Sequence, residues 1–110
     1  MGTGYLESVN YSATLDGLII AMCKDYARRE RALMTKSCSP RTMMEYKYLN
    51  IRLHEAAQEV AGEHASAYIN EIGEKIGYAY SKAGAVSEST YKMRKKEVKL
   101  NIARKLHLID

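Results

Sequence analysis

The chain has no tryptophan, no phenylalanine, a single proline and only two cysteines among its 110 residues. Two thiols without a CxxC spacing do not form a disulfide framework, which excludes the small disulfide-stabilised secreted class and favours a reduced, cytoplasmic setting. The longest apolar run, Leu18 to Cys23, is far shorter than the roughly 20 residues of a membrane helix, so we expect no membrane partner. Without Trp and Phe, the nine tyrosines and six methionines supply much of the large apolar surface, and Met packs adaptably.

The scarcity of proline, together with the absence of alternating apolar and polar residues, predicts an all-α fold. A length of 110 residues fits one domain with a modest core. We expect a single all-helical domain of four helices with a C-terminal helix-turn-helix-like unit. Its parts are a loose leader at residues 1–10, a helical hairpin over residues 12–61 and a helix-turn-helix-like region over residues 63–110.

Apolar spacing and capping residues predict the two helices of the hairpin. Apolar residues recurring every three or four positions place the first helix from Ser12 to about Lys36. Ser39 as N-cap and Pro40 at the first helical position begin the second helix, which stops before Gly62. Its heptad-like seam comprises Tyr46, Leu49, Leu53, Ala56 and Val60, with Met44, Tyr48 and Ile51 as a second apolar strip. Two apolar strips need neighbours on two sides, and the last helix also carries a second apolar strip. The apolar strips of these two helices together favour a homodimer.

The third helix is expected to begin between Glu63 and Ser66 and to extend to about Tyr80. Gly73 and Gly77 lie four residues apart inside this pattern, and each costs about 1 kcal/mol of helix propensity relative to Ala. They therefore indicate close approach by another helix, or a turn near Gly77. The buried stripe of this helix is expected to comprise Ala65, Ile69, Ile72, Ile76 and Ala79 or Tyr80.

Positive charge is concentrated at the C-terminal end of the chain. Residues 91–110 contain seven Lys or Arg against two Asp or Glu, whereas the first ninety residues contain ten against eleven. The same segment is predicted to form the fourth helix, capped by Ser87 or Ser89 and extending to about Leu106. Its core face is expected to comprise Tyr91, Val98, Ile102, Leu106 and Ile109, with Met93, Leu100 and Leu108 on the far side. A localised positive potential points to a polyanionic partner.

The order of parts from Ala67 to Leu106 is that of a helix-turn-helix DNA-binding unit, in which a second, capped helix enters the major groove. Hydroxyl side chains and free N–H groups at a helix N-terminus suit phosphates, and Arg or Lys one or two turns later reach phosphates or base edges. The DNA-binding residues predicted on this basis are Ser87, Ser89, Thr90, Lys92, Arg94, Lys95, Lys96 and Lys99. An alternative start of this helix at Ser81 would add Lys82. The competing interpretation is a solvated basic face on the last helix of a bundle.

The C-terminal 45 residues resemble phage transcriptional regulators of the RinA/ArpU kind, which are related in shape to the promoter-binding region of sigma factors. The resemblance lies in three loose motifs, found here at Ile69 to Tyr78, Ser87 to Lys95 and Ile102 to Leu106. It implies a DNA-binding helix over the residues named above. The stretch from Ala79 to Val86 departs from the pattern, because it is longer than a turn of three or four residues.

Sequence motifs of catalysis and metal binding are weak. His54-Glu55 begins like a zinc protease motif, but Gln58 stands where the second histidine is required. There is no Gly-x-Ser-x-Gly elbow and no Walker or dinucleotide-binding glycine loop, and neither cysteine has a recognisable catalytic context. We therefore expect no enzyme activity, no metal, no cofactor and no small-molecule substrate.

The function favoured by the sequence is double-stranded DNA binding by a small phage or mobile-element regulator that acts as a homodimer. The alternative is a non-enzymatic helical bundle that serves protein interaction or phage assembly. A third possibility is a basic amphipathic segment that contacts an acidic protein or an anionic surface.

Overall fold

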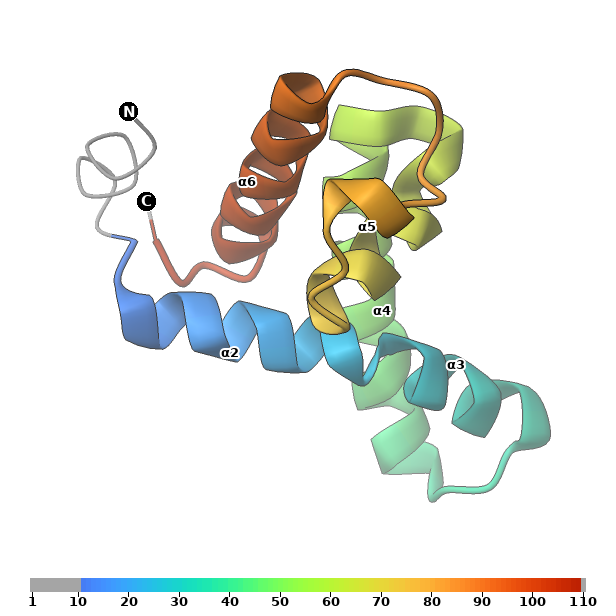
Figure 1. The fold of residues 1–110 in the computed structure, drawn as a ribbon. Coiled ribbons are helices and arrows are strands. Elements are labelled where there is room, and N and C mark those ends of the chain that lie inside the picture. Colours follow the sequence, from blue (N-terminus) through green and yellow to red (C-terminus); the bar gives the residue numbers. More distant parts are fainter. Residues whose placement is uncertain (1–10, 110) are drawn as a thin grey trace.

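The computed structural model describes residues 11–109, and this part of the chain is helical without a strand. The α-helices are α2 (Ala13–Lys24), α3 (Tyr26–Thr35), α4 (Pro40–Ala61), α5 (Ala65–Gly73) and α6 (Glu88–Lys105) (Figure 1). Two 3-10 segments, η1 (Gly62–His64) and η2 (Tyr78–Tyr80), lie between α4 and α6. The predicted all-α fold is confirmed, whereas the predicted leader at residues 1–10 lies outside the described residues.

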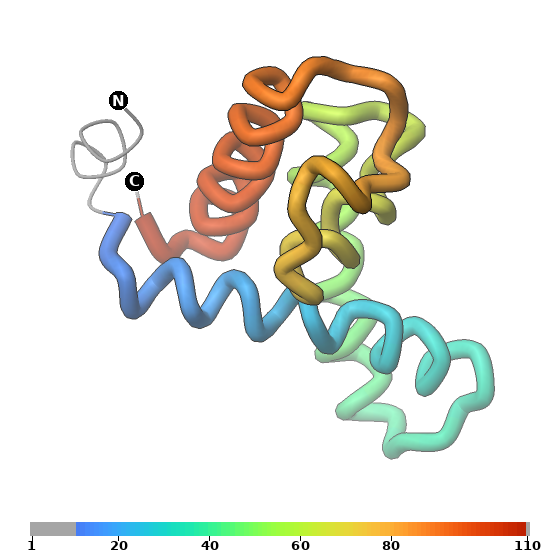
Figure 2. The backbone as a smooth tube through the Cα atoms, in the orientation of Figure 1, coloured from blue at the N-terminus to red at the C-terminus, as the bar shows by residue number. Residues whose placement is uncertain are grey.

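The longest helix, α4, is the central element of the fold. It packs against α3, α5 and α6, while α2 crosses the end of this group and packs mainly against α5. The tube view shows the segment after α6, residues 106–109, running to the beginning of α2 (Figure 2). The 74–87 segment runs from α5 past the α4–α5 turn to the start of α6.

Serine caps begin three of the helices. Ser12, Ser39 and Ser87 each accept a hydrogen bond from the backbone N–H three residues later, at 3.1 to 3.2 Å. Pro40 occupies the first position of α4, and Gly62, with φ of +56°, ends it. These starts and this stop are confirmed, and of the alternatives left open for the last helix, Ser87, Ser89 and Ser81, Ser87 is the cap.

The prediction of one continuous first helix is wrong, because the helix breaks at Asp25 into α2 and α3. In an unbroken helix the Met22 carbonyl would accept from the N–H of residue 26. Here it accepts from the Arg29 guanidinium at 2.6 Å. Arg29 is 4% exposed and also donates through Nε to Asn50 Oδ1 on α4 at 2.6 Å. A buried tertiary contact thus stabilises the break.

The prediction of a third helix reaching Tyr80 is also wrong, because α5 ends at Gly73. Lys75 adopts a left-handed conformation with φ of 56°, its N–H donates to the Ile72 carbonyl, and the Ile76 N–H donates to the Glu71 carbonyl at 2.9 Å. This is the Schellman motif that usually employs glycine. Ala79 and Tyr80, expected in the buried stripe, are exposed, whereas Ile69 and Ile72 are buried as predicted.

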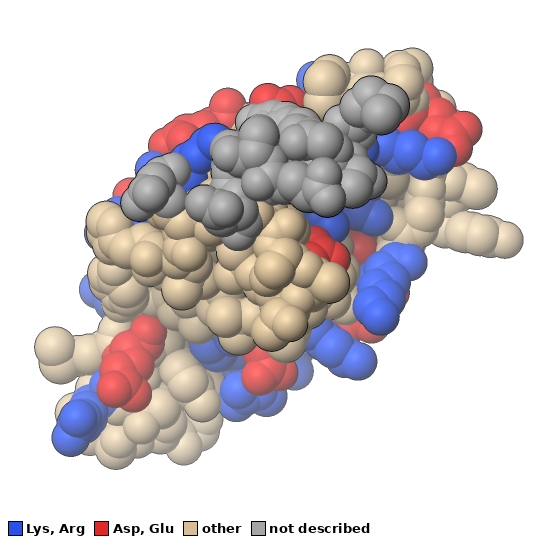
Figure 3. Space-filling view, turned by 90° about the vertical axis from the view of Figure 1, so that its left-hand side faces the viewer, with Lys and Arg blue, Asp and Glu red and all other residues tan. Residues whose placement is uncertain are grey.

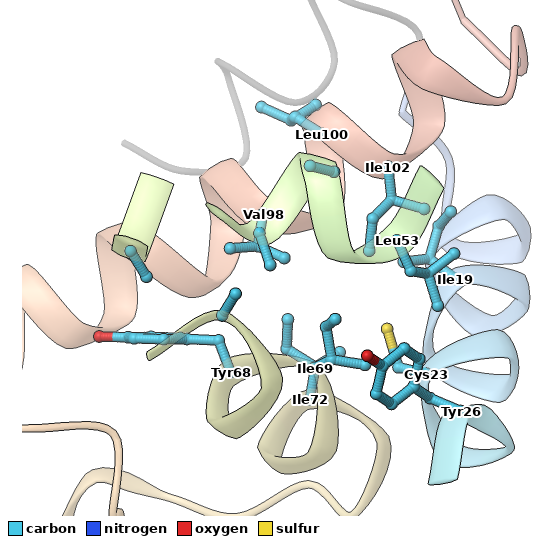
Figure 4. Close-up of a cluster of buried hydrophobic side chains, with 14 of the residues drawn as sticks. Ile19, Cys23, Tyr26, Leu53, Tyr68, Ile69, Ile72, Val98, Leu100 and Ile102 are labelled. Atoms are coloured by element: carbon cyan, nitrogen blue, oxygen red, sulfur yellow. The ribbon is translucent and has the colours of Figure 1, made fainter. Parts of the chain in front are cut away.

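Side chains from α2, α4, α5 and α6 meet in the hydrophobic core (Figure 4). The predicted core face of α6 is confirmed by the buried Tyr91, Val98 and Ile102. Leu100 is buried as well, contrary to its expected place on the far side, whereas Met93 and Leu108 remain exposed. The other large buried side chains include Ile19, Cys23, Leu53, Tyr68, Ile69 and Ile72.

Candidate nucleic-acid interface

The predicted interface begins at the N-terminal turn of α6, where Ser87 forms the cap. Its Oγ accepts from the Thr90 N–H at 3.2 Å and donates to Thr90 Oγ1 at 2.9 Å. Ser89 Oγ lies 3.3 Å from Ser87 Oγ on the exposed side. The hydroxyl groups of Ser87 and Thr90 therefore stabilise the start of the helix, and Ser89 is exposed next to them.

A buried carboxylate fixes this turn to the rest of the fold. Glu71 on α5 is 5% exposed and accepts from Tyr91 Oη and Ser81 Oγ through Oε1, both at 2.7 Å, and from the Lys82 N–H through Oε2, also at 2.7 Å. Burial alone would raise the pKa of Glu71, but these donors, led by the Lys82 N–H, outweigh it and lower the pKa below its ordinary value. Glu71 thus joins α5, the 74–87 segment and α6.

The ring of Tyr91 packs against two other tyrosine rings. The Tyr91 ring lies between Tyr68 and Tyr78, with centroid distances of 5.5 and 5.8 Å. The Tyr91 hydroxyl also donates to the Ile76 carbonyl at 3.1 Å. Burial and the hydrogen bond to Glu71 raise the pKa of Tyr91 to about 12, so the hydroxyl stays protonated and its single proton is shared between the Glu71 carboxylate at 2.7 Å and the Ile76 carbonyl at 3.1 Å.

Two of the predicted DNA-binding lysines make internal contacts. Lys95 Nζ donates to the Ile76 carbonyl at 2.8 Å and lies 5.2 Å from the Tyr91 ring centroid, and burial lowers the pKa of this amine. Lys99 Nζ pairs with Asp16 on α2 at 2.9 Å, with its side chain 20% exposed. Both residues hold α6 in place, so their charges are less available to a ligand.

The other predicted basic residues lie on two sides of α6. At 3.6 residues per turn, Ser89, Lys92 and Lys96 fall within roughly 60° of one another, whereas Arg94 lies on the opposite side. Lys92 and Lys96 are exposed, and Arg94 is half-buried. Lys92 pairs with Glu88 at 2.9 Å, but both side chains are more than half exposed, so this ion pair contributes little to the stability of the fold. The open basic group of α6 therefore consists of Ser89, Lys92 and Lys96.

A shallow groove of about 680 Å³ lies beside this group, a feature that the sequence interpretation missed. It is lined by residues 75–80 together with Glu88 and Lys92. Tyr80 is 82% exposed, and Tyr78 is 39% exposed. The two tyrosines between Lys75 and Lys82 could have indicated this groove, but the sequence pattern suggested a continuous helix there. The alternative that placed Lys82 on the last helix is wrong, since Lys82 lies in the preceding loop.

The charged residues elsewhere show mixed signs. On the face drawn in Figure 3, Lys and Arg side chains alternate with Asp and Glu and leave a large uncharged area. Glu55, which belongs to the incomplete zinc protease motif, pairs with Arg52 at 2.6 Å, and Glu59, one turn later on α4, pairs with Lys105 at 2.7 Å. Within residues 11–109, no group of three His, Cys, Asp or Glu side chains could hold a metal ion.

Burial raises the pKa of the Cys23 thiol to about 12, so this buried cysteine is a poor nucleophile at neutral pH. Cys38 is partly exposed.

None of the helices in the described part of the chain has the length and apolar character to cross a membrane.

No protein-family model matches the chain, and the comparisons with curated proteins and with solved structures gave no match.

Proposed function

We propose that this chain is a non-enzymatic protein that binds double-stranded DNA through the N-terminal half of α6, as a transcriptional regulator of the phage or mobile-element kind. The proposal rests on the different surroundings of the lysines along α6. Lys95 and Lys99 are fixed by internal partners at 2.8 and 2.9 Å, whereas Lys92 and Lys96 lie exposed on one face beside Ser89. A rigid helix that presents lysines at i and i+4 next to its own N-terminus suits contact with successive phosphates.

A gel-shift series with random duplex DNA at rising salt tests this function. We expect binding at low salt and a steep loss of affinity as salt rises, because each phosphate contact releases condensed counterions. The absence of any shift at low salt would rule out DNA binding, and binding that does not respond to salt would rule out phosphate contact as its basis.

The second candidate is a helical bundle that serves protein interaction, and the exposed side of α4 favours it. Met44, Tyr48 and Ile51 are 74%, 51% and 41% exposed, and they are the strip that the sequence predicted to need a second neighbour. The described residues provide no such neighbour.

A homodimer formed through this strip is compatible with both candidates. Sedimentation at micromolar concentration should then give a dimer, and Ile51→Glu should shift it to a monomer, since the charge would enter the interface. Met34→Glu is the matched control, because Met34 is also exposed, at 82%, but lies on α3. A wild-type monomer, or a dimer that survives Ile51→Glu, would contradict this interface.

A further inference from the structure

Tyr80 is the most exposed aromatic residue of the described chain whose surroundings also suit a nucleic acid. It is 82% exposed and lines the groove that Lys75 and Lys92 also border. A partner that covers this ring would gain the free energy of removing its apolar surface from water. Two lysines, Lys75 and Lys92, line the groove against one carboxylate, that of Glu88, which pairs with Lys92 at 2.9 Å. This positive balance indicates a partner that combines a flat apolar face with negative charge.

The backbone that presents Tyr80 is held firmly. The Tyr80 N–H donates to the Gly77 carbonyl at 3.1 Å, and Tyr78 Oη donates to the Val86 carbonyl at 2.7 Å, which ties the two ends of the loop together. Directly after Tyr80, the side chain of Ser81 and the N–H of Lys82 donate to Glu71 at 2.7 Å. The segment around the ring is thus ordered before any ligand arrives, which lowers the entropy cost of binding.

We propose that Tyr80 stacks on an unpaired base of a nucleic acid whose backbone lies along Lys75, Lys92 and Lys96. Inside a duplex both faces of every base are covered by neighbouring pairs, so away from the duplex ends a tyrosine ring finds an open face only on an unpaired base. Since Lys92 belongs both to the groove and to the open basic group of α6, one ligand can contact both. The preferred substrate is therefore a duplex with a single-stranded extension.

This inference rests on the proposed DNA binding and adds a junction preference to it. Stacking of a base on an aromatic side chain strengthens binding by about tenfold. Because most of the Tyr80 ring faces solvent, its replacement should leave the fold intact, and thermal unfolding checks this.

The experiment measures fluorescence anisotropy with a blunt duplex, the same duplex carrying a short single-stranded extension, and the extension strand alone. The wild type should bind the extended duplex about tenfold more tightly than the blunt one. Tyr80→Ala should bind both duplexes equally, whereas Tyr80→Phe should keep the preference because phenylalanine retains the ring. Met34→Ala, which removes an apolar side chain that is equally exposed at 82% but lies on α3, should also keep it.

Equal wild-type affinity for the two duplexes, or a preference that persists in Tyr80→Ala, would overturn the stacking site while leaving duplex binding intact. Binding to the single strand alone would overturn the duplex proposal and keep the stacking site. Failure to bind any of the three probes would overturn both.

Discussion

The hydroxyl of Tyr91 on α6 donates to the buried carboxylate of Glu71 on α5 at 2.7 Å. This contact joins helices that are separated in sequence by the 74–87 segment, and that segment adds two more donors to the same carboxylate from Ser81 and Lys82. Together with the contact of Lys95 with Ile76, this side chain fixes the N-terminal half of α6, and hence the position of Lys92 and Lys96.

Replacement of this carboxylate should destabilise the fold. In Glu71→Gln the amide cannot accept all three donors, and hydrogen bonds to a buried charged group contribute about 1.5–3 kcal/mol each. We expect the free energy of unfolding in urea to fall by at least about 2 kcal/mol. Glu74→Gln, at an exposed position on the same turn, is the control and should change little.

The same residue should make stability depend on pH. Because the pKa of Glu71 in the folded protein lies below its ordinary value of 4.5, its contribution is fully present above that pH and is lost as the pH falls through the folded pKa. Urea unfolding at a series of pH values from neutral to acidic should show this loss in the wild type. Glu71→Gln should show a flatter dependence, and an equal slope in both proteins would contradict the assignment.

Gly73 permits the close crossing of α5 over α2. A Cβ at this position would lie 2.5 Å from the Lys24 Cα, and backbone atoms of a packed helix cannot move away cheaply. Gly73→Ala should therefore lower the free energy of unfolding by several kcal/mol. Gly17→Ala is the contrast, since nothing lies within 4 Å and alanine is the better helix former, and it should stabilise by about 1 kcal/mol. Thermal unfolding of the two variants should show a lower melting temperature for Gly73→Ala and a higher one for Gly17→Ala.

Tyr68 is fully buried, and its hydroxyl has no hydrogen-bond partner within the described part of the chain. A buried unsatisfied polar group costs about 1–3 kcal/mol. Tyr68→Phe removes this group and keeps the ring that packs on Tyr91 at 5.5 Å. We expect the melting temperature to stay the same or rise by several degrees. A clear drop would mean that the hydroxyl makes a stabilising contact in solution.

The sequence predicted features that depend on local chemistry. The caps at Ser12, Ser39 and Ser87 and the stop at Gly62 follow from residues next to each other in the chain, and the structure confirms each of them. The close approach at Gly73 was also foreseen, because a glycine inside a helix pattern needs a reason.

The unpredicted features depend on residues far apart in the sequence. The break at Asp25 rests on a buried Arg29 that contacts Asn50, and α5 ends at a lysine, Lys75, in a conformation usually given to glycine. For the same reason the sequence could not separate Lys95 and Lys99 from Lys92 and Lys96. These lysines carry the same charge in the same segment, and only their tertiary partners distinguish them. Lys95 contacts Ile76 and Lys99 contacts Asp16.

The difference between the internal and the open lysines can be tested by measuring the stability of alanine variants. Lys99→Ala breaks the partly buried pair with Asp16 and should lower the free energy of unfolding by about 1 kcal/mol or less, whereas Lys96→Ala should leave it unchanged. Urea denaturation of the two variants provides the comparison. Equal effects would contradict the division of α6 into internal and open lysines.

DNA binding through the open basic group of α6 is tested most directly by the slope of log affinity for duplex DNA against log salt concentration. We expect Lys92→Ala/Lys96→Ala to reduce this slope by roughly 1.8, because each lost phosphate contact removes about 0.9. The control is Arg31→Ala/Lys47→Ala, which removes two exposed charges from α3 and α4. It should leave the slope close to that of the wild type. Equal slopes for all three proteins would contradict DNA binding through the open basic group of α6.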